Sequence, residues 1–165
     1  MNEVRQWQRS DLSAIQQIAW ETWADAYGAF VPEVDRRVFH DSYYDLLKLK
    51  NLFDSGIVHG CVALVDEFTV GFSKTFWDES ESKFFITSLY VLPQYQKLSL
   101  GKRMLEYGVN IARSSYNLDR VWLGVMVENK PAIDWYLRQG FIFEESKPFT
   151  LGNTTIEHLY GYLLI

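Results

Sequence analysis

Hydrophobic positions in the first third of the chain change from the spacing of a strand to that of a helix. Residues 3–7 predict a short strand. Apolar side chains then recur every three or four positions over residues 12–26, which predicts a helix with Asp11 as its N-cap. Pro32 breaks the chain, and a second helix is expected over residues 41–52.

The rest of the chain reads as strands that alternate with two further helices. We expect strands over residues 57–65, 68–77, 84–92, 120–127, 141–143 and 154–163, and helices over residues 101–115 and 131–139. Asp66 and Glu67 lie where the first two of these strands would turn into an antiparallel pair. This mixed order predicts an α/β fold with helices covering a sheet. No repeat or linker interrupts residues 1–165, so we expect one domain.

Composition places the chain among globular proteins. It has 165 residues, of which 48% are apolar and 22% charged, enough to bury a core. The single cysteine, Cys61, excludes an internal disulfide and suits a reducing, cytoplasmic location. The first residues show no basic segment followed by an apolar stretch, so no signal peptide is expected. No apolar run approaches the roughly 20 residues of a membrane span, and no metal site is expected.

Charge and aromatic residues are unevenly distributed. The net charge of −5 argues against a general nucleic-acid binder. Residues 93–130 carry six basic and three acidic side chains, whereas the remainder carries ten basic and eighteen acidic ones. This split suits an anionic ligand on one region and a cationic ligand on the other, or it is ordinary surface variation. The many aromatic residues of the first third either form core and a homodimer interface or wall a substrate slot.

One strand, loop and helix start form a candidate anion site. Residues 88–105 run from a strand that ends at Pro93 into a helix that begins near Gly101. The N–H groups of a helix N-terminus have no partner within the helix and bind phosphate well. Lys97, Lys102 and Arg103 add positive charge there. Such junctions are common, so this signal alone is weak.

A second stretch of the sequence supports the interpretation of the first as an anion site. It follows the strand over residues 121–127 and contains Asn129, Ala132, Tyr136, Gly140 and Phe141. This spacing matches the pattern Asn-x-x-Ala-x-x-x-Tyr-x-x-x-Gly-Phe at every position. Together with the loop after Pro93, it closely resembles the GNAT superfamily of N-acetyltransferases over residues 84–143.

The resemblance implies a fold and a cosubstrate site. The fold would be a mixed, mostly antiparallel sheet with a central splayed strand pair, covered by helices. Acetyl-CoA would lie where the strand ending at Leu92 splays away from the strand over residues 120–127. Its pantetheine arm would pair with the backbone of Leu89, Tyr90 and Val91. Its pyrophosphate would take the amides of Gln96, Lys97, Leu98, Ser99, Leu100, Gly101 and Lys102. Asn129 and Tyr136 would face the acetyl end, and Ala132 would also belong to the cofactor-binding residues.

The expected chemistry is attack of a neutral amine on the thioester carbonyl. A backbone N–H near Leu89 or Tyr90 would stabilise the oxyanion, an effect often worth about 3 kcal/mol. Tyr136 would act as the general acid that protonates the departing sulfur, because a phenol stays protonated at neutral pH. The alternative is that Tyr136 is only a helix aromatic packed on the core.

The sequence departs from the family at two positions. Ser99 replaces the first loop glycine, which allows positive φ and close approach to phosphate. Thr87 stands where many members carry a glutamate that serves as general base. A base, if needed, must come from elsewhere. Glu21 and Asp25, one helical turn apart, are candidates, although surface acids are the default interpretation.

The acceptor is less well defined by the sequence. Residues 20–27 and 121–125 look like bacterial spermine/spermidine acetyltransferases within the superfamily. We therefore expect acetyl transfer to a primary amine of a small cationic molecule, such as a polyamine. The alternatives are acetylation of a protein N-terminus or lysine, and a CoA-binding module that has lost catalysis through the changes at Ser99 and Thr87.

Overall fold

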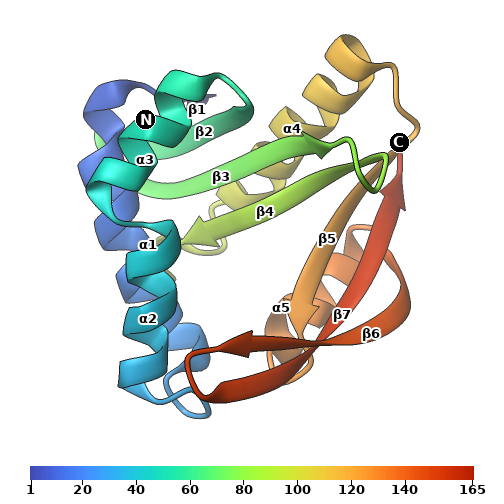
Figure 1. Cartoon of the computed structure of the whole chain (residues 1–165). Coiled ribbons are helices and arrows are strands. Elements are labelled where there is room, and N and C mark those ends of the chain that lie inside the picture. The colour runs from blue at the N-terminus through green and yellow to red at the C-terminus, as the bar shows by residue number, and fades with distance from the viewer.

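A computed structural model describes residues 1–165 and shows a seven-stranded sheet with helices on both faces (Figure 1). The strands follow the order β1-β2-β3-β4-β5-β7-β6. Their bounds are β1 Asn2–Gln6, β2 Val58–Val65, β3 Phe68–Asp78, β4 Lys83–Val91, β5 Arg120–Met126, β6 Ile142–Leu151 and β7 Thr154–Leu164. The helices are α1 Leu12–Tyr27, α2 Glu33–Tyr43, α3 Leu46–Ser55, α4 Leu100–Tyr116 and α5 Lys130–Arg138. None of them combines the length and apolar composition that crossing a membrane requires.

The sheet confirms the expected mixed architecture. All neighbouring strands pair antiparallel except β4 and β5, which run parallel and pair only at Phe85 and Trp122. Beyond that pair, β4 and β5 diverge, and this is the splayed strand pair that the resemblance implied (Figure 1). The β2–β3 hairpin turns at Asp66 and Glu67 as predicted, with φ of 48° and 71°.

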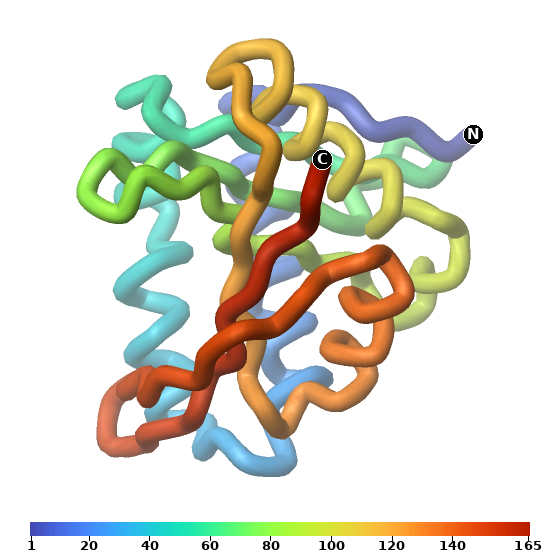
Figure 2. Tube along the Cα trace, turned by 90° about the vertical axis from the view of Figure 1, so that its right-hand side faces the viewer, coloured from blue at the N-terminus to red at the C-terminus, as the bar shows by residue number.

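The helices divide between the two faces of the sheet. α1 and α3 pack against β2 and β3 through one apolar cluster that includes Ile15, Leu49, Val62 and Phe72. α4 covers the opposite face with Met104, Leu105 and Val109, and α5 extends this layer beside β5 (Figure 1). From the side, β5 and β7 run along each other and β6 lies outermost (Figure 2). The splay of β4 and β5 is therefore enclosed between two helical layers.

The single helix predicted over residues 41–52 is wrong, because two helices occupy this region. α2 already begins at Glu33, and the chain breaks at Tyr44 before α3 begins at Leu46. The Asp45 carboxylate accepts hydrogen bonds from the amides of Leu47 and Lys48, which fixes the new N-terminus. α2 escaped notice because most of its residues are polar, so few apolar side chains mark it as a helix.

Two smaller expectations also need correction. Asp11 precedes α1, but its side chain does not cap that helix. It accepts instead from the Gln8 amide at 2.7 Å and from the Arg5 guanidinium at 2.8 and 2.9 Å, which ties β1 to the following turn. β6 is ten residues long rather than three. Its polar residues and Pro148 hid it, and both are tolerated because β6 is an edge strand.

Candidate active site

The divergence of β4 and β5 leaves part of the β4 backbone without a strand partner. From Ser88 onward, the edge of β4 that faces β5 has no ladder hydrogen bonds. A β-bulge precedes this stretch, since Lys74 pairs with Ser88 while Thr75 pairs with Ile86, and Thr87 is the extra residue. Bulges bend a strand and increase its twist, which helps β4 turn away from β5. An extended arm of a ligand can pair with this free edge.

The loop at residues 96–102 presents a set of unpaired amides. Ser99 is the N-cap of α4, but its side chain makes no capping hydrogen bond. Lys97 and Ser99 both adopt left-handed conformations, with φ of 69° and 59°. The N–H groups from Lys97 through Lys102 donate to no protein acceptor. Left-handed residues at a helix N-terminus form a concave anion-binding nest, so this loop fits a pyrophosphate.

The loop side chains contribute unequally to this site. Lys97 and Lys102 are exposed beside the amides and carry positive charge toward an anion. Gln96 turns back, and its amide donates to the Val91 carbonyl at 3.2 Å. Arg103 reaches away to the carbonyl of Asn2 at 3.0 Å. The positive charge available at the nest therefore comes mainly from the two lysines and the helix dipole.

A cluster of three phenols lies beside the splay, with Tyr27 buried and Tyr90 and Tyr136 half-buried, and we call it the phenol cluster. It consists of Tyr27, Tyr90 and Tyr136 with Trp23 and Asn129. The Trp23 indole donates to the Tyr90 hydroxyl at 3.0 Å, and the Asn129 amide donates to the Tyr27 hydroxyl at 3.3 Å. Burial raises the pKa of all three tyrosines, and hydrogen bonds from Asn129 and Tyr90 partly offset this at Tyr27. The phenols thus remain protonated at neutral pH.

Asn129 and Tyr136 reach the phenol cluster from α5. The Asn129 carbonyl oxygen caps this helix by accepting from the Ala132 amide at 3.3 Å, which leaves its NH₂ group free to hold Tyr27. Tyr136 packs its ring edge-on against Phe141 at 5.3 Å. The spacing from Asn129 to Tyr136 in the sequence pattern therefore has two roles. It lets Asn129 cap α5, and it brings the Tyr136 phenol to the widening end of the splay.

The comparisons agree with this geometry. The profile of the Acetyltransferase (GNAT) family matches residues 12–141. The chain belongs to the GNAT family. This confirms the resemblance seen over residues 84–143 and extends it to the helices on the other face of the sheet.

Sequence relatives of this GNAT chain match it over less than half of its length. N-alpha-acetyltransferase 50 of Danio rerio is 32% identical over 69 residues, which are 42% of this chain and 41% of that protein. An N-alpha-acetyltransferase of Sulfurisphaera tokodaii is 38% identical over 56 residues, 34% of each chain. The chain thus spans about two fifths or less of the length of these curated relatives.

Solved structures match the GNAT chain over nearly its whole length. PaiA N-acetyltransferase from Thermoplasma acidophilum, in complex with coenzyme A, has a TM-score of 0.78 at 21% identity and covers 96% of this chain and 98% of its own. Spermidine N-acetyltransferase from Vibrio cholerae, with CoA and spermine, has a TM-score of 0.73 at 17% identity and covers 99% and 95%. At these identities the likeness concerns the fold.

The structure does not bring the two expected carboxylates to the phenol cluster. Glu21 and Asp25 are both exposed, whereas Trp23 and Tyr27 on the same helix are buried. Glu21 accepts a hydrogen bond from Gln17 at 2.7 Å. It also lines a hollow of about 270 Å³ between α1 and the turn after β4. Their role as general base stays a prediction without a contact to support it.

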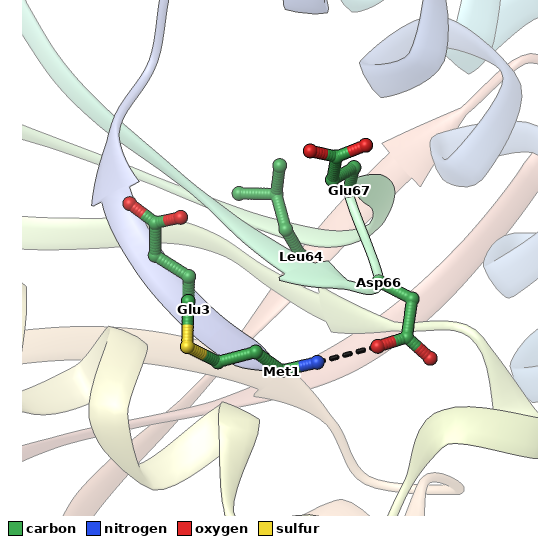
Figure 3. Close-up of a pocket in the computed structure, with 5 residues that line it drawn as sticks. All are labelled: Met1, Glu3, Leu64, Asp66 and Glu67. Atoms are coloured by element: carbon green, nitrogen blue, oxygen red, sulfur yellow. Dashed lines mark hydrogen bonds and ion pairs between the residues drawn. The ribbon is translucent and has the colours of Figure 1, made fainter.

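A second hollow lies far from the splay, at the β1–β2 edge of the sheet. It has a volume of about 580 Å³ and is lined by Met1, Glu3, Leu64, Asp66 and Glu67 (Figure 3). The N-terminal amine at this hollow is paired with the Asp66 carboxylate (Figure 3). The hollow contains none of the residues expected to bind acetyl-CoA, so we do not include it in the site.

The structure joins two aromatic residues of the first third to rings of β6 and β7 in a line on the α1–α3 side of the splay, which we call the aromatic bridge. It runs from Tyr44 through Phe39 and Phe149 to His158, with ring centroids 6.2, 6.0 and 4.7 Å apart. It joins α2 to the β6–β7 hairpin. Asp35 reinforces this junction by accepting from the Asn153 amide at 2.9 Å and from the Thr154 hydroxyl. Half of this bridge comes from β6 and β7, where no sequence pattern pointed to a site.

Proposed function

We propose that this GNAT chain transfers the acetyl group of acetyl-CoA to a primary amine of a small cationic acceptor. The observation that carries this proposal is the nest of unpaired amides at residues 97–102, adjoining the free edge of β4. One feature fits a pyrophosphate and the other fits an extended arm, and CoA has both. The family assignment and the coenzyme A bound to the Thermoplasma neighbour support acetyl-CoA as the cosubstrate.

The phenol cluster supports the acid role proposed for Tyr136. Its buried hydroxyl keeps its proton at neutral pH and can deliver it to the departing sulfur. Asn129 holds Tyr27 in place next to it. An amide of β4 near Leu89 or Tyr90 would stabilise the oxyanion as the amine attacks. In this proposal the protein's residues supply positioning and one proton, and the thioester supplies the driving force.

The aromatic bridge supports a cationic acceptor. Two of its rings, Phe39 and Phe149, are only partly buried, and aromatic faces attract ammonium groups with energies of about 0.5–2 kcal/mol each. The chain outside residues 93–130 also has an excess of eight acidic side chains. The spermine in the Vibrio neighbour is a compound of this class. A polyamine is therefore the acceptor that we would test first.

One observation favours a second acceptor class. The sequence relatives are N-alpha-acetyltransferases, and they match at higher identity than the structural neighbours do. A protein N-terminus is thus the alternative acceptor. The third possibility, a CoA-binding module without catalysis, rests on Ser99 and Thr87. Cytoplasmic location, one domain and a homodimer remain predictions of the sequence.

Two measurements test the proposal. Acetyl-CoA at a hundredfold excess over its dissociation constant should stabilise the fold by about 2.7 kcal/mol, seen as a rise in melting temperature. Thiol release should then be followed with spermidine, spermine and a short peptide with a free N-terminus. Turnover on the polyamines supports the first acceptor class, and turnover on the peptide alone supports the second. Absence of any thermal shift at millimolar acetyl-CoA would refute the cosubstrate site.

A further inference from the structure

His158 lies next to the widest part of the splay. It belongs to β7 and pairs with Met126 at the end of β5. Paired residues of antiparallel strands point to the same face of a sheet. The Met126 side chain is buried in a cluster with Trp23 and Tyr27. The His158 ring therefore lies on the same side of the sheet as the phenol cluster and ends the aromatic bridge.

The two ring nitrogens of His158 have different surroundings. Nδ1 is sealed from solvent and has no hydrogen-bond partner of good geometry. Such an orphan costs about 1–3 kcal/mol and calls for an explanation. The Ile156 carbonyl is near enough to favour the protonated ring. A proton on Nδ1 would face this carbonyl and leave the lone pair on Nε2, which is not sealed. This is the arrangement of a histidine that accepts protons through Nε2.

Burial keeps His158 neutral at neutral pH despite the carboxylates around it. Burial lowers the pKa of the imidazole, and this exceeds the opposite effects of the Ile156 carbonyl, Glu128 and Glu157. On the neighbouring strand, Lys147 pairs opposite His158 but is bound to Glu145 at 2.8 Å. On the side of the aromatic bridge, Phe149 adds no charge. A neutral imidazole with carboxylates nearby is suited to receive a cation and take a proton from it.

We propose that His158 is the general base that removes a proton from the acceptor amine. The role rests on the acetyl transfer proposed above, and it supplies the base that Thr87 cannot provide. The acceptor ammonium gives one proton to Nε2 and becomes a neutral amine. Its nitrogen forms a bond to the thioester carbon, and the C–S bond breaks with its electron pair going to sulfur. The sulfur takes a proton from Tyr136 and leaves as CoA thiol, and the attacking nitrogen gives up its second proton to restore Tyr136. His158 then releases its proton to water.

The test compares His158→Gln with wild type over pH 5.5–9.5. The probe is whichever of spermidine, spermine and the N-terminal peptide the wild type turns over fastest, used at saturation with acetyl-CoA. Wild-type kcat should fall as pH drops through an ionisation below 6.5, because the protonated imidazole cannot act as base. The variant should lose about 10²–10⁴-fold in kcat near pH 7. Its residual rate should rise steadily with pH as the amine loses its own proton, so that the deficit shrinks by pH 9.5.

The matched control is His59→Gln. His59 lies on the α4 side of the sheet, where its ring bonds to the Tyr116 hydroxyl at 2.8 Å. This variant should keep the wild-type pH profile even if it is less stable. Added imidazole should restore part of the rate that His158→Ala loses. It should leave the rate of the control unchanged. Melting temperatures of all variants separate loss of folding from loss of a base.

The outcomes distinguish the two proposals. If His158→Gln keeps the wild-type profile while the wild type is active, His158 is not the base and acetyl transfer stands. If the variant is slower by the same factor at every pH and imidazole restores nothing, the role is structural and the proposal fails. A wild type that binds acetyl-CoA but acetylates none of the three probes overturns the proposed function together with this role.

Discussion

Replacing Lys74 tests how burial of a charged group affects the stability of this fold. Lys74 lies in the middle of β3, and only 6% of its surface is exposed. The ammonium lies over the ring of Tyr44, 4.3 Å from its centroid, and forms no ion pair. Burial lowers the pKa of this lysine from 10.5 to about 8. Replacing it with methionine keeps the length of the side chain and removes the charge.

The size of the expected effect follows from that pKa. Each pH unit between 10.5 and about 8 corresponds to about 1.4 kcal/mol, so charging Lys74 costs the fold about 3 kcal/mol. Methionine forgoes the cation–π contact with Tyr44, worth about 1 kcal/mol. Lys74→Met should therefore stabilise the protein by about 2 kcal/mol at pH 7, or by about 4–8 °C in melting temperature.

The sign of the pH dependence is also fixed. Between pH 8 and 10.5 the unfolded chain binds more protons at this position than the folded chain does. Wild-type stability at this site therefore rises with pH across that window, and below it the full cost is present. The gain from Lys74→Met should be complete at pH 7 and should shrink toward pH 10.

Urea unfolding without ligand at pH 7 measures the gain in unfolding free energy from Lys74→Met. The same measurement at pH 10 shows how far that gain has decreased. Lys102→Met is the matched control, because Lys102 is exposed and its replacement should change the unfolding free energy by less than about 0.5 kcal/mol. A Lys74→Met variant that is no more stable than wild type at pH 7 would refute the argument from burial. So would a gain that is the same at both pH values.

The remaining predictions concern the loop, the acid and the hairpin. Ser99→Gly relieves a left-handed serine and should leave acetyl-CoA affinity unchanged or improved, whereas Ser99→Asp should weaken it about tenfold by calorimetry; equal affinity for the aspartate variant would place the phosphates elsewhere. Tyr136→Phe should lower turnover about 10- to 1000-fold with little change in melting temperature, and wild-type turnover would remove Tyr136 from the mechanism. Gly152→Ala puts a methyl into direct overlap with Asp35 Oδ1 and should cost about 2 kcal/mol more by calorimetry than Gly56→Ala, which has a similar φ but open space; equal costs would show that the hairpin junction adapts.

The sequence determined the elements whose signals are local. The turn at Asp66 and Glu67 and the helix that follows Asn129 depend on residues close in the chain, and they lie where the pattern predicted them. The spacing from Asn129 to Phe141 predicted its helix correctly for the same reason, because it encodes one helix and its two ends. The family and the splayed pair followed from that segment. Ser99 was also recognised as unusual, and its φ of 59° shows the strain that a glycine would avoid.

Only the tertiary structure decided which distant residues share the site. Tyr27 and Asn129 are 102 positions apart and share a hydrogen bond. His158 lies beside the end of β5 because β7, rather than the preceding strand β6, pairs with β5. The exposure of Glu21 and the burial of Lys74 likewise depend on which face of an element the rest of the chain covers. Periodicity shows that a helix or strand has two faces, but long-range packing determines what each face meets.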